Sequence, residues 1–209
     1  MATLLPFCAL RPLAELAARV ASPPYDVVST QEARSLARGN ADSFLRVSRP
    51  EIDLPEGIDE HADAVHAKGR ENLAELVRRG VLVADAQPRL YVYAQRMGEH
   101  RQTGLVACAA VDEYDRDLIR KHEKTRADKE NDRVRHIDTL SAHDEPVFLT
   151  YRAVTAIDRA IEEVKRAAPA FDFETDDGVG HQLWVAPAAA GDAIAALFRN
   201  VPALYVADG

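Results

Sequence analysis

Residues 119–136 form the most polar stretch of the chain, and their side-chain types are suited to holding an anion. From Arg120 through Arg133 the only apolar side chain is Ala127, so hydrophobic burial cannot fix this stretch in place. Residues 119–136 contain seven Lys or Arg and four Asp or Glu, a local charge of +3 in a chain of formal net charge −8. Guanidinium and ammonium groups at this density favour contact with phosphoryl oxygens.

Helical spacing would place five potential cations of this stretch on one face. They follow one another at separations of 4, 3, 4 and 3 positions: His122, Arg126, Lys129, Arg133 and His136. Like charges on one stripe repel one another unless an anion or facing carboxylates neutralise them. Two interpretations stay open, a solvated helix with surface ion pairs and a phosphate site. In the second, Arg126 and Arg133 grip phosphoryl oxygens and Lys129 supplies a point charge.

A second candidate lies in the sequence Pro23-Pro24-Tyr25-Asp26. The prolines forbid helix and force an extended path, which would hold Tyr25 and Asp26 rigidly. A carboxylate positioned in this way suits acid–base work or contact with a substrate amine. The alternative interpretation is a plain connector in which Asp26 forms a turn.

Zinc and phosphate-loop signatures are missing from the sequence. His122-Glu123 lacks the second histidine of an HExxH helix, and the chain has no P-loop and no GxGxxG. Residues 178–180 (Gly-Val-Gly) are typical of a hairpin turn rather than a phosphate cradle. Metal binding is therefore the weakest of the interpretations for the charged stretch.

Composition excludes several classes of protein. A net charge of −8 and a pI near 5.4 argue against general binding to nucleic acid or to an anionic membrane. No apolar run approaches the ~18 residues of a membrane span, and the N-terminus does not read as a signal peptide. Cys8 and Cys108 are isolated thiols in apolar settings, which predicts small core residues of a reducing compartment. We expect a cytoplasmic protein.

Helices and hairpins are predicted to alternate without a regular βαβ rhythm. Periodicity and capping signals predict helices over residues 12–20, 29–39, 58–79, 155–167 and 188–198. The second of these opens with Ser29-Thr30-Gln31-Glu32, the pattern of a capping box. Strands are expected over residues 43–47, 81–83, 90–94, 104–111, 146–151, 171–175, 182–186 and 204–206. Two hairpins are predicted among them, one that turns at Met97-Gly98-Glu99-His100 and one that turns at Asp176-Asp177-Gly178. This pattern predicts an α+β fold with a mixed, mainly antiparallel sheet and flanking helices.

The last residues, Leu204 to Gly209, read as a buried strand that runs into a tight turn. A turn of this kind normally leads into a further element. We therefore expect residues 1–209 to form a single α+β unit that is the N-terminal part of a longer protein.

Several blocks of the sequence resemble one bacterial family, the domain of unknown function 1015. The blocks are SPPYDVVS (residues 22–29), RPEIDLP (49–55), LYVYAQ (90–95), IRKHEKTRADKENDR (119–133) and the terminal LYVADG. In that family the last strand continues as Asp-Gly-His-His-Arg-Tyr. This motif is similar to the nucleotide-binding turn of the ParB/sulfiredoxin-like fold, which includes free serine kinases. The resemblance therefore implies ParB/sulfiredoxin-like elements with a large insertion.

The resemblance also implies roles for particular residues. A nucleotide phosphate would be held by a set from the polar signature and the terminal turn: His122, Arg126, Lys129, Arg133, Asp208 and Gly209. Tyr25 and Thr125 would contact the substrate, and Asp26 or Glu123 would accept a hydroxyl proton. Asp132, or alternatively Glu123, would hold a metal ion.

The function implied is a nucleotide-dependent phosphotransferase that acts on a small hydroxylated metabolite, with free serine as the first substrate to try. Its cofactors would be ATP or ADP with Mg²⁺, and its partners the small-molecule substrate and the nucleotide. Two alternatives stay open: a nucleotide- or metabolite-sensing regulator without catalysis, and a phosphoester hydrolase. The sequence does not determine the oligomeric state.

Overall fold

The computed structural model describes residues 2–121 and 125–208, which fall into two compact units. Unit 1 comprises Met1–Glu15, Ala84–Glu123 and Val147–Gly209, and unit 2 comprises Leu16–Val83 and Lys124–Pro146. The organisation of all 209 residues as a single α+β unit stays a prediction.

Unit 1 carries most of the strands, in mainly antiparallel sheets. Its strands are β1 (Leu4–Leu5), β2 (Leu10–Pro12), β4 (Tyr91–Met97), β5 (His100–Val106), β6 (Cys108–Ala109), β7 (Ile119–Arg120), β8 (Phe148–Thr150), β9 (Phe171–Glu174), β10 (Val179–Val185) and β11 (Leu204–Asp208). The main sheet has the order β5-β4-β10-β9 and is antiparallel throughout. In a second sheet, β11 pairs parallel with β7 and antiparallel with β8. A mixed, mainly antiparallel architecture is thus confirmed.

Both predicted hairpins are present in the main sheet. The β4–β5 hairpin pairs Met97 with His100, and Gly98 takes the φ of +60° that this tight turn requires. The β9–β10 hairpin turns at Gly178, where φ is +80°. Strand β10 begins at Val179, three residues before the predicted start at residue 182, because Val179 still pairs with Met97 of β4.

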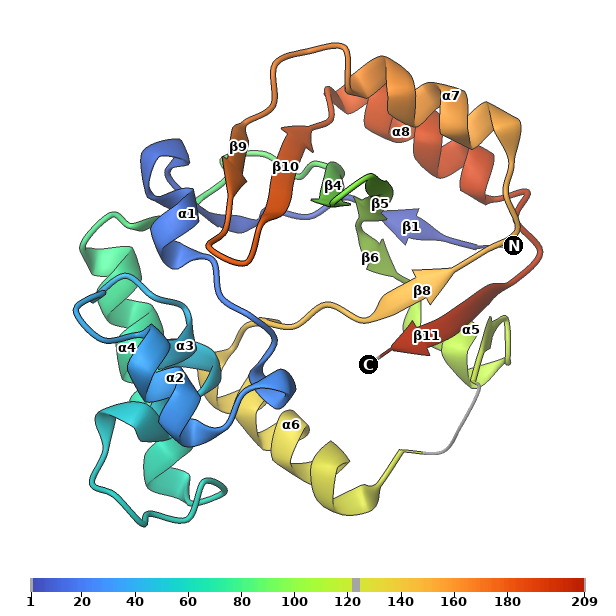
Figure 1. Ribbon diagram of the computed structural model, residues 1–209. Coiled ribbons are helices and arrows are strands. Elements are labelled where there is room, and N and C mark those ends of the chain that lie inside the picture. The colour runs from blue at the N-terminus through green and yellow to red at the C-terminus, as the bar shows by residue number, and fades with distance from the viewer. Residues whose placement is uncertain (1, 122–124, 209) are drawn as a thin grey trace. The chain divides into compact units, whose positions relative to one another are not determined.

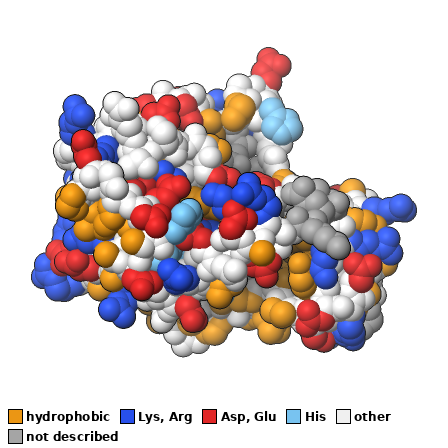
Figure 2. All heavy atoms as spheres, turned by 90° about the horizontal axis from the view of Figure 1, so that it is seen from below, with side chains coloured by type: hydrophobic (Ala, Val, Ile, Leu, Met, Phe, Trp, Pro, Cys, Tyr) orange, Lys and Arg blue, Asp and Glu red, His pale blue; other side chains and the backbone are white. Residues whose placement is uncertain are grey.

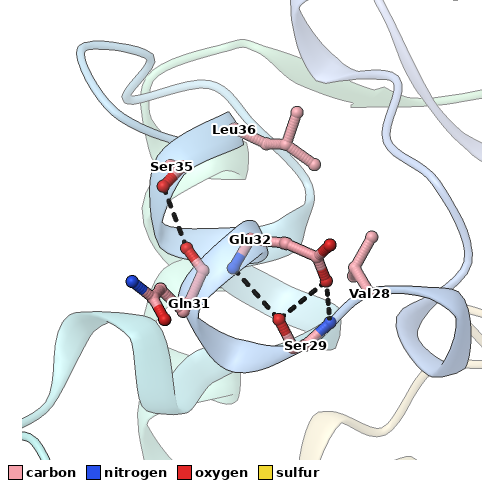
Figure 3. Close-up of a pocket in the computed structure, with 6 residues that line it drawn as sticks. All are labelled: Val28, Ser29, Gln31, Glu32, Ser35 and Leu36. Atoms are coloured by element: carbon pink, nitrogen blue, oxygen red, sulfur yellow. Dashed lines mark hydrogen bonds between the residues drawn. The ribbon is translucent and has the colours of Figure 1, made fainter.

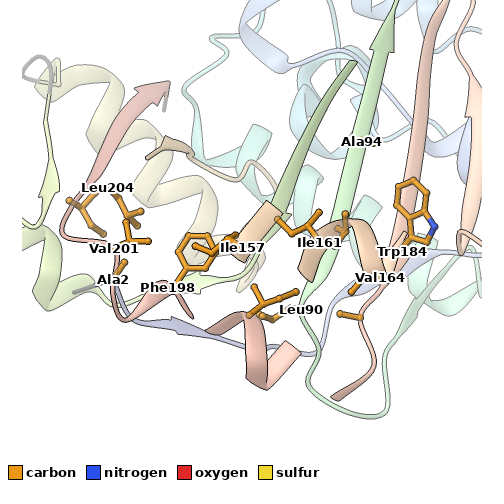
Figure 4. Packing of buried hydrophobic residues seen from close by; sticks show 14 residues of the cluster. Ala2, Leu90, Ala94, Ile157, Ile161, Val164, Trp184, Phe198, Val201 and Leu204 are labelled. Atoms are coloured by element: carbon orange, nitrogen blue, oxygen red, sulfur yellow. The ribbon is translucent and has the colours of Figure 1, made fainter. Parts of the chain in front are cut away.

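The core of unit 1 lies between its strands and two helices that run side by side, α7 (Thr155–Val164) and α8 (Ala188–Phe198) (Figure 1). Ile157 and Ile161 of α7 pack with Trp184 of β10 and Phe198 of α8 (Figure 4). The Trp184 indole N–H donates to the Ala167 carbonyl at 2.9 Å, which satisfies its polar atom inside the core. Helix α8 has the bounds predicted from sequence. A short helix, α5 (Val111–Asp115), completes the helices of this unit in the described part of the chain.

Unit 2 is largely helical. Its helices are α1 (Ala17–Val20), the 3-10 turn η2 (Tyr25–Val27), α2 (Thr30–Leu36), α3 (Leu45–Ser48), the 3-10 turn η3 (Pro50–Asp53), α4 (Asp63–Arg78) and α6 (Ala127–Leu140). The 3-10 turn η1 (Ala14–Leu16) and strand β3 (Leu82–Ala84) lie at the junctions between the units. Val47, Leu73, Leu76 and Leu140 form its main apolar cluster, which fixes α4 and α6 against each other.

Three predictions of helices and strands that involve unit 2 are wrong. The helix predicted over residues 12–20 is reduced to α1, because residue 12 ends β2 and η1 precedes α1. Residues 43–47 do not form a strand, because the Phe44 carbonyl accepts the N–H groups of Val47 and Ser48 and winds the segment into α3. Helix α4 begins at Asp63 rather than near residue 58, since the preceding residues form turns after Pro55 and Gly57, where φ is +83°. The capping box at the start of α2 is confirmed, with Ser29 and Glu32 bonded reciprocally.

The cysteines are a further correction. Cys8 and Cys108 are both exposed rather than buried in the core. Their neighbours Phe7, Ala9, Ala107 and Ala109 are themselves only partly buried. An apolar setting in sequence does not decide which side chains face inward.

Candidate functional site

The candidate site lies in unit 2, where one face of α6 turns toward the rest of that unit. Helix α6 begins after Arg126 and ends at Ser141, whose left-handed φ of +52° terminates the helix. Its apolar anchor, Leu140, comes at the C-terminal end, and helical spacing carries the same face back through residues 136, 133 and 132. Asp132, Arg133 and His136 are therefore held by packing, whereas the first turn is solvated.

Arg133 is the central cation of this site. Its guanidinium carbon lies 4.1 Å from the centre of the Tyr25 ring, a cation–π contact. Its Nη2 donates to Asp132 Oδ2 at 3.0 Å, and its Nη1 lies 3.7 Å from Glu145 Oε2. Among the described residues, the buried Nε and Nη1 atoms of Arg133 have no hydrogen-bond partner. Buried donors of this kind are costly unless a further acceptor is bound.

The segment Pro23-Pro24-Tyr25-Asp26, here named the diproline corner, supplies the aromatic ring of the site. Pro24 is extended, with ψ of 147°, and the chain then turns through η2. Arg49 Nη1 donates to the Tyr25 carbonyl at 3.4 Å, and Arg49 is itself bound to Glu51 at 2.8 Å and to the Thr30 hydroxyl at 2.8 Å. Burial raises the pKa of the Tyr25 hydroxyl, so that group stays neutral as it lies near Arg133.

Glu145 is the acid of the site. Burial, together with the neighbouring charge of Asp144, raises the pKa of Glu145 to about 7, although Arg133 and a backbone hydrogen bond from Tyr25 act in the opposite direction. A carboxyl group with a pKa near neutrality exchanges protons readily at physiological pH. The site thus places a proton acceptor beside a cation with unused donors.

A histidine–aspartate network lies behind Asp132. His61 Nδ1 lies 2.8 Å from Asp132 Oδ1, and His66 Nε2 lies 3.4 Å from the same oxygen. His66 and His136 meet through their Nδ1 atoms at 3.4 Å, and His136 Nε2 lies 3.1 Å from Asp144 Oδ2. Hydrogen bonds from His61 and Arg133 hold the pKa of Asp132 below its usual value although burial opposes this.

The structure brings some of the predicted site residues together in unit 2. Tyr25, Asp132 and Arg133 are in contact. Asp26 is exposed, but its charge reaches the Tyr25 hydroxyl and Glu145 and raises the pKa of each.

Other predicted residues lie elsewhere. Arg126 is 74% exposed and pairs with Asp128, the Thr125 hydroxyl donates to Glu130, and Lys129 is exposed. Asp208 ends β11 of unit 1. Three predicted residues lie outside the described part of the chain: His122, Glu123 and Gly209. For Arg126 this exposed, ion-paired position favours the interpretation as a solvated side chain. The roles of the other residues stay predictions.

Sequence reasoning missed part of the site. Glu145, Asp144 and His66 carried no motif, and His136 was considered only as a surface cation, whereas its side chain is 1% exposed. The available signal was helical spacing, since His136 stands four positions before the buried Leu140.

A surface hollow of about 570 Å³ lies against α2, but it does not form a site of this kind. Figure 3 shows that its polar groups are largely used by the α2 capping box. It is lined by Val28, Ser29, Gln31, Glu32, Ser35 and Leu36.

Within residues 2–121 and 125–208, no group of three or more His, Cys, Asp or Glu side chains is arranged to hold a metal ion. On the face in Figure 2, acidic and basic side chains are interspersed.

In the described part of the chain, no helix has the length and apolar character needed to cross a membrane.

Comparisons with known proteins identify the family. Neither the curated proteins nor the solved structures gave a match to the chain. One family model, described as "Protein of unknown function (DUF1015)", matches residues 4–209. The chain therefore belongs to the DUF1015 family.

Proposed function

We propose that this protein is a nucleotide-dependent phosphotransferase that acts on a small hydroxylated metabolite, of the free serine kinase type. The observation that carries the proposal is the Arg133–Glu145 pair in unit 2. Arg133 offers two buried nitrogens without a hydrogen-bond partner among the described residues, and Glu145 has a pKa of about 7.

Arg133 would bind the phosphoryl group. Phosphoryl transfer depends mainly on positioning and on cations that stabilise charge spread over the phosphoryl oxygens. The Tyr25 ring on one side of the guanidinium and Asp132 on Nη2 restrict its movement, so its Nε and Nη1 donors have a defined direction. Binding of a phosphoryl oxygen would also satisfy donors that are otherwise buried at a cost of about 1–3 kcal/mol each.

Glu145 would act as the general base, the role that sequence reasoning gave to Asp26 or Glu123. The substrate hydroxyl oxygen forms a bond to the terminal phosphorus of the nucleotide while the bond from that phosphorus to the bridging oxygen breaks. The hydroxyl proton passes to the Glu145 carboxylate, and the products are a phosphoester and the shortened nucleotide. Asp26, whose charge raises the pKa of Glu145, supports this role.

The arrangement does not fit Asp132 as a magnesium ligand. Its Oδ1 is bonded to His61 and its Oδ2 to Arg133, and no metal-holding group occurs among the described residues. We therefore assign Asp132 to the positioning of Arg133 and derive no step through magnesium.

The test is phosphoester formation from ATP or ADP and a panel of amino acids and sugars that includes serine. The wild-type protein, Arg133→Gln and Glu145→Gln are compared with Arg126→Gln, a matched arginine at the exposed start of α6. We expect turnover in the wild type and in Arg126→Gln, and a loss of about 100-fold or more in the other two variants.

Three outcomes would overturn the proposal. Nucleotide binding without phosphorylation of any acceptor would identify a sensor. Phosphate release from phosphoserine without added nucleotide would identify a hydrolase. Equal turnover in Arg133→Gln and Arg126→Gln would show that Arg133 is not the phosphoryl ligand.

A further inference from the structure

Two buried imidazoles connect the site to the interior of unit 2. His66 of α4 and His136 of α6 face each other through their Nδ1 atoms at 3.4 Å. The approach of the two helices depends on Gly69 of α4, since a Cβ at that position would lie 3.3 Å from His136 Cε1 and 3.1 Å from the Val47 carbonyl oxygen. Neither histidine has a role in the phosphotransfer proposed above.

The hydrogen-bond partners restrict where the ring protons can be. A carboxylate oxygen only accepts, so His136 Nε2, at 3.1 Å from Asp144 Oδ2, must carry a proton. One proton must also lie between the two Nδ1 atoms. If the rings hold only these two protons, His66 Nε2 has a bare lone pair 3.4 Å from Asp132 Oδ1, so two acceptors face each other.

A third proton removes this conflict. It would reside on His66 Nε2, which is buried and has no hydrogen-bond partner in the described part of the chain. It would face the Asp132 carboxylate, whose other contacts are His61 and the Arg133 guanidinium. The pair then carries one positive charge between two carboxylates, Asp132 and Asp144.

We propose that His66 and His136 form one proton-binding unit which takes up a single proton at His66 Nε2, and that this unit positions Asp132 and through it Arg133. When the rings hold two protons, the Asp132 carboxylate interacts mainly with Arg133. When they hold three, the carboxylate also interacts with the positively charged His66, so Arg133 is freer to bind an anion. The protonation half of this inference stands alone, and the anion half rests on the proposed function.

The surrounding charges come from each element packed against the pair. Helix α6 contributes Asp132, Arg133 and Arg135, the segment before α4 contributes His61, and the segment after α6 contributes Asp144. Burial lowers the pKa of His66, Asp132 raises it, and His136 and the arginines lower it further. On the remaining side, Gly69 brings Val47 and the Pro50 ring close to the pair, and neither side chain is charged.

The protonation half is tested by nitrogen-15 NMR of the histidine rings between pH 5 and 8. We expect the His66 and His136 signals to change together over one transition, in which only one proton is gained. Asp144→Asn should shift that transition, because an amide can accept or donate and no longer fixes the proton on His136 Nε2. His100→Gln, at an exposed histidine of unit 1, serves as the control. Two independent transitions, or no change over this range, would overturn the inference.

The anion half is tested with sulfate, whose charge is constant over this pH range. Measurements use Glu145→Gln, so that the carboxyl group does not titrate. We expect sulfate to bind more tightly as pH falls through the shared transition, by about tenfold or less, which is the effect of one partly screened charge. His66→Gln in the same background should abolish this pH dependence.

The two proposals fail in different ways. An unchanged pH dependence in the His66→Gln background would overturn the anion half of the inference. An absence of sulfate binding at every pH would contradict the role of Arg133 in the proposed function, while the NMR titration still decides whether the histidines share a proton.

Discussion

The Arg133 guanidinium lies over the ring of Tyr25, with 4.1 Å between the guanidinium carbon and the ring centre. These two residues lie more than a hundred positions apart in sequence, one in the diproline corner and the other in the polar stretch. Their contact within unit 2 places residues of both blocks in the same site. Arg126, just before α6, has no such ring contact among the described residues and pairs only with the exposed Asp128.

Replacement of Tyr25 tests whether the ring positions Arg133. Tyr25→Leu removes the aromatic face, and we expect unit 2 to lose about 0.5–2 kcal/mol of stability and the anion affinity to fall. Tyr25→Phe keeps the ring and serves as the matched control, with little change expected. The measurement is hydrogen exchange of the α6 amides together with calorimetry of phosphate binding. Equal effects of Phe and Leu would show that the hydroxyl group, rather than the ring, is what matters.

Glu145 gives the stability of unit 2 a pH dependence whose sign can be worked out. Its pKa is about 7 in the folded protein and near 4.5 when unfolded, so the folded state favours the protonated form. Its contribution is therefore fully present below pH 4.5 and is lost as pH rises toward 7, by roughly 1 to 3 kcal/mol. Glu145→Gln, which cannot ionise, should remove this loss and be more stable than the wild type at pH 8.

The difference in the stability of unit 2 between the wild type and Glu145→Gln is measured by hydrogen exchange of the α6 amides at pH 4.5, 6 and 8. His66 acts in the opposite direction: its pKa is lowered by burial, so its contribution is present above about pH 6.5 and is lost as pH falls. Glu71→Gln, at an exposed glutamate of α4, is the control. A difference that does not vary with pH would contradict the assigned role of Glu145.

Gly69 is predicted to be required for the contact between α4 and its neighbours. An added Cβ would lie 3.0 Å from the Pro50 ring and 3.1 Å from the Val47 carbonyl oxygen, and neither can move away cheaply. We expect Gly69→Ala to destabilise unit 2 by about 1–3 kcal/mol although alanine favours helix. Urea unfolding followed by circular dichroism at 222 nm measures the change. Gly104→Ala, in open space on β5, is the control, and equal stabilities would contradict the packing argument.

The sequence was most informative where local signals decide structure. The Ser29–Glu32 capping box, the turn at Gly98 and the apolar periodicity of α8 each depend on residues close in sequence, and each was predicted correctly. The segment at residues 43–47 was mistaken for a strand because its short apolar pattern fits either structure. Leu45 and Val47 in fact face different apolar clusters of unit 2 from a helical turn.

The site could be predicted only in part for the same reason. Tyr25, Asp132 and Arg133 were found because their blocks stand out in sequence. Glu145 was not found, since its raised pKa arises from burial and from the charge of Asp144 after the chain has folded. The spacing of the charged residues also could not distinguish the solvated Arg126 from Arg133, whose side chain is 25% exposed.

Calorimetric titration of inorganic phosphate into the wild-type protein, Arg133→Gln and Arg126→Gln at pH 7 tests the central claim most directly. The predicted result is measurable binding to the wild type and to Arg126→Gln, and an affinity at least about tenfold weaker in Arg133→Gln, as expected for a charge-assisted hydrogen bond. Binding that is unaffected by Arg133→Gln, or that falls equally in both variants, would contradict the claim that Arg133 is the anion ligand of this protein.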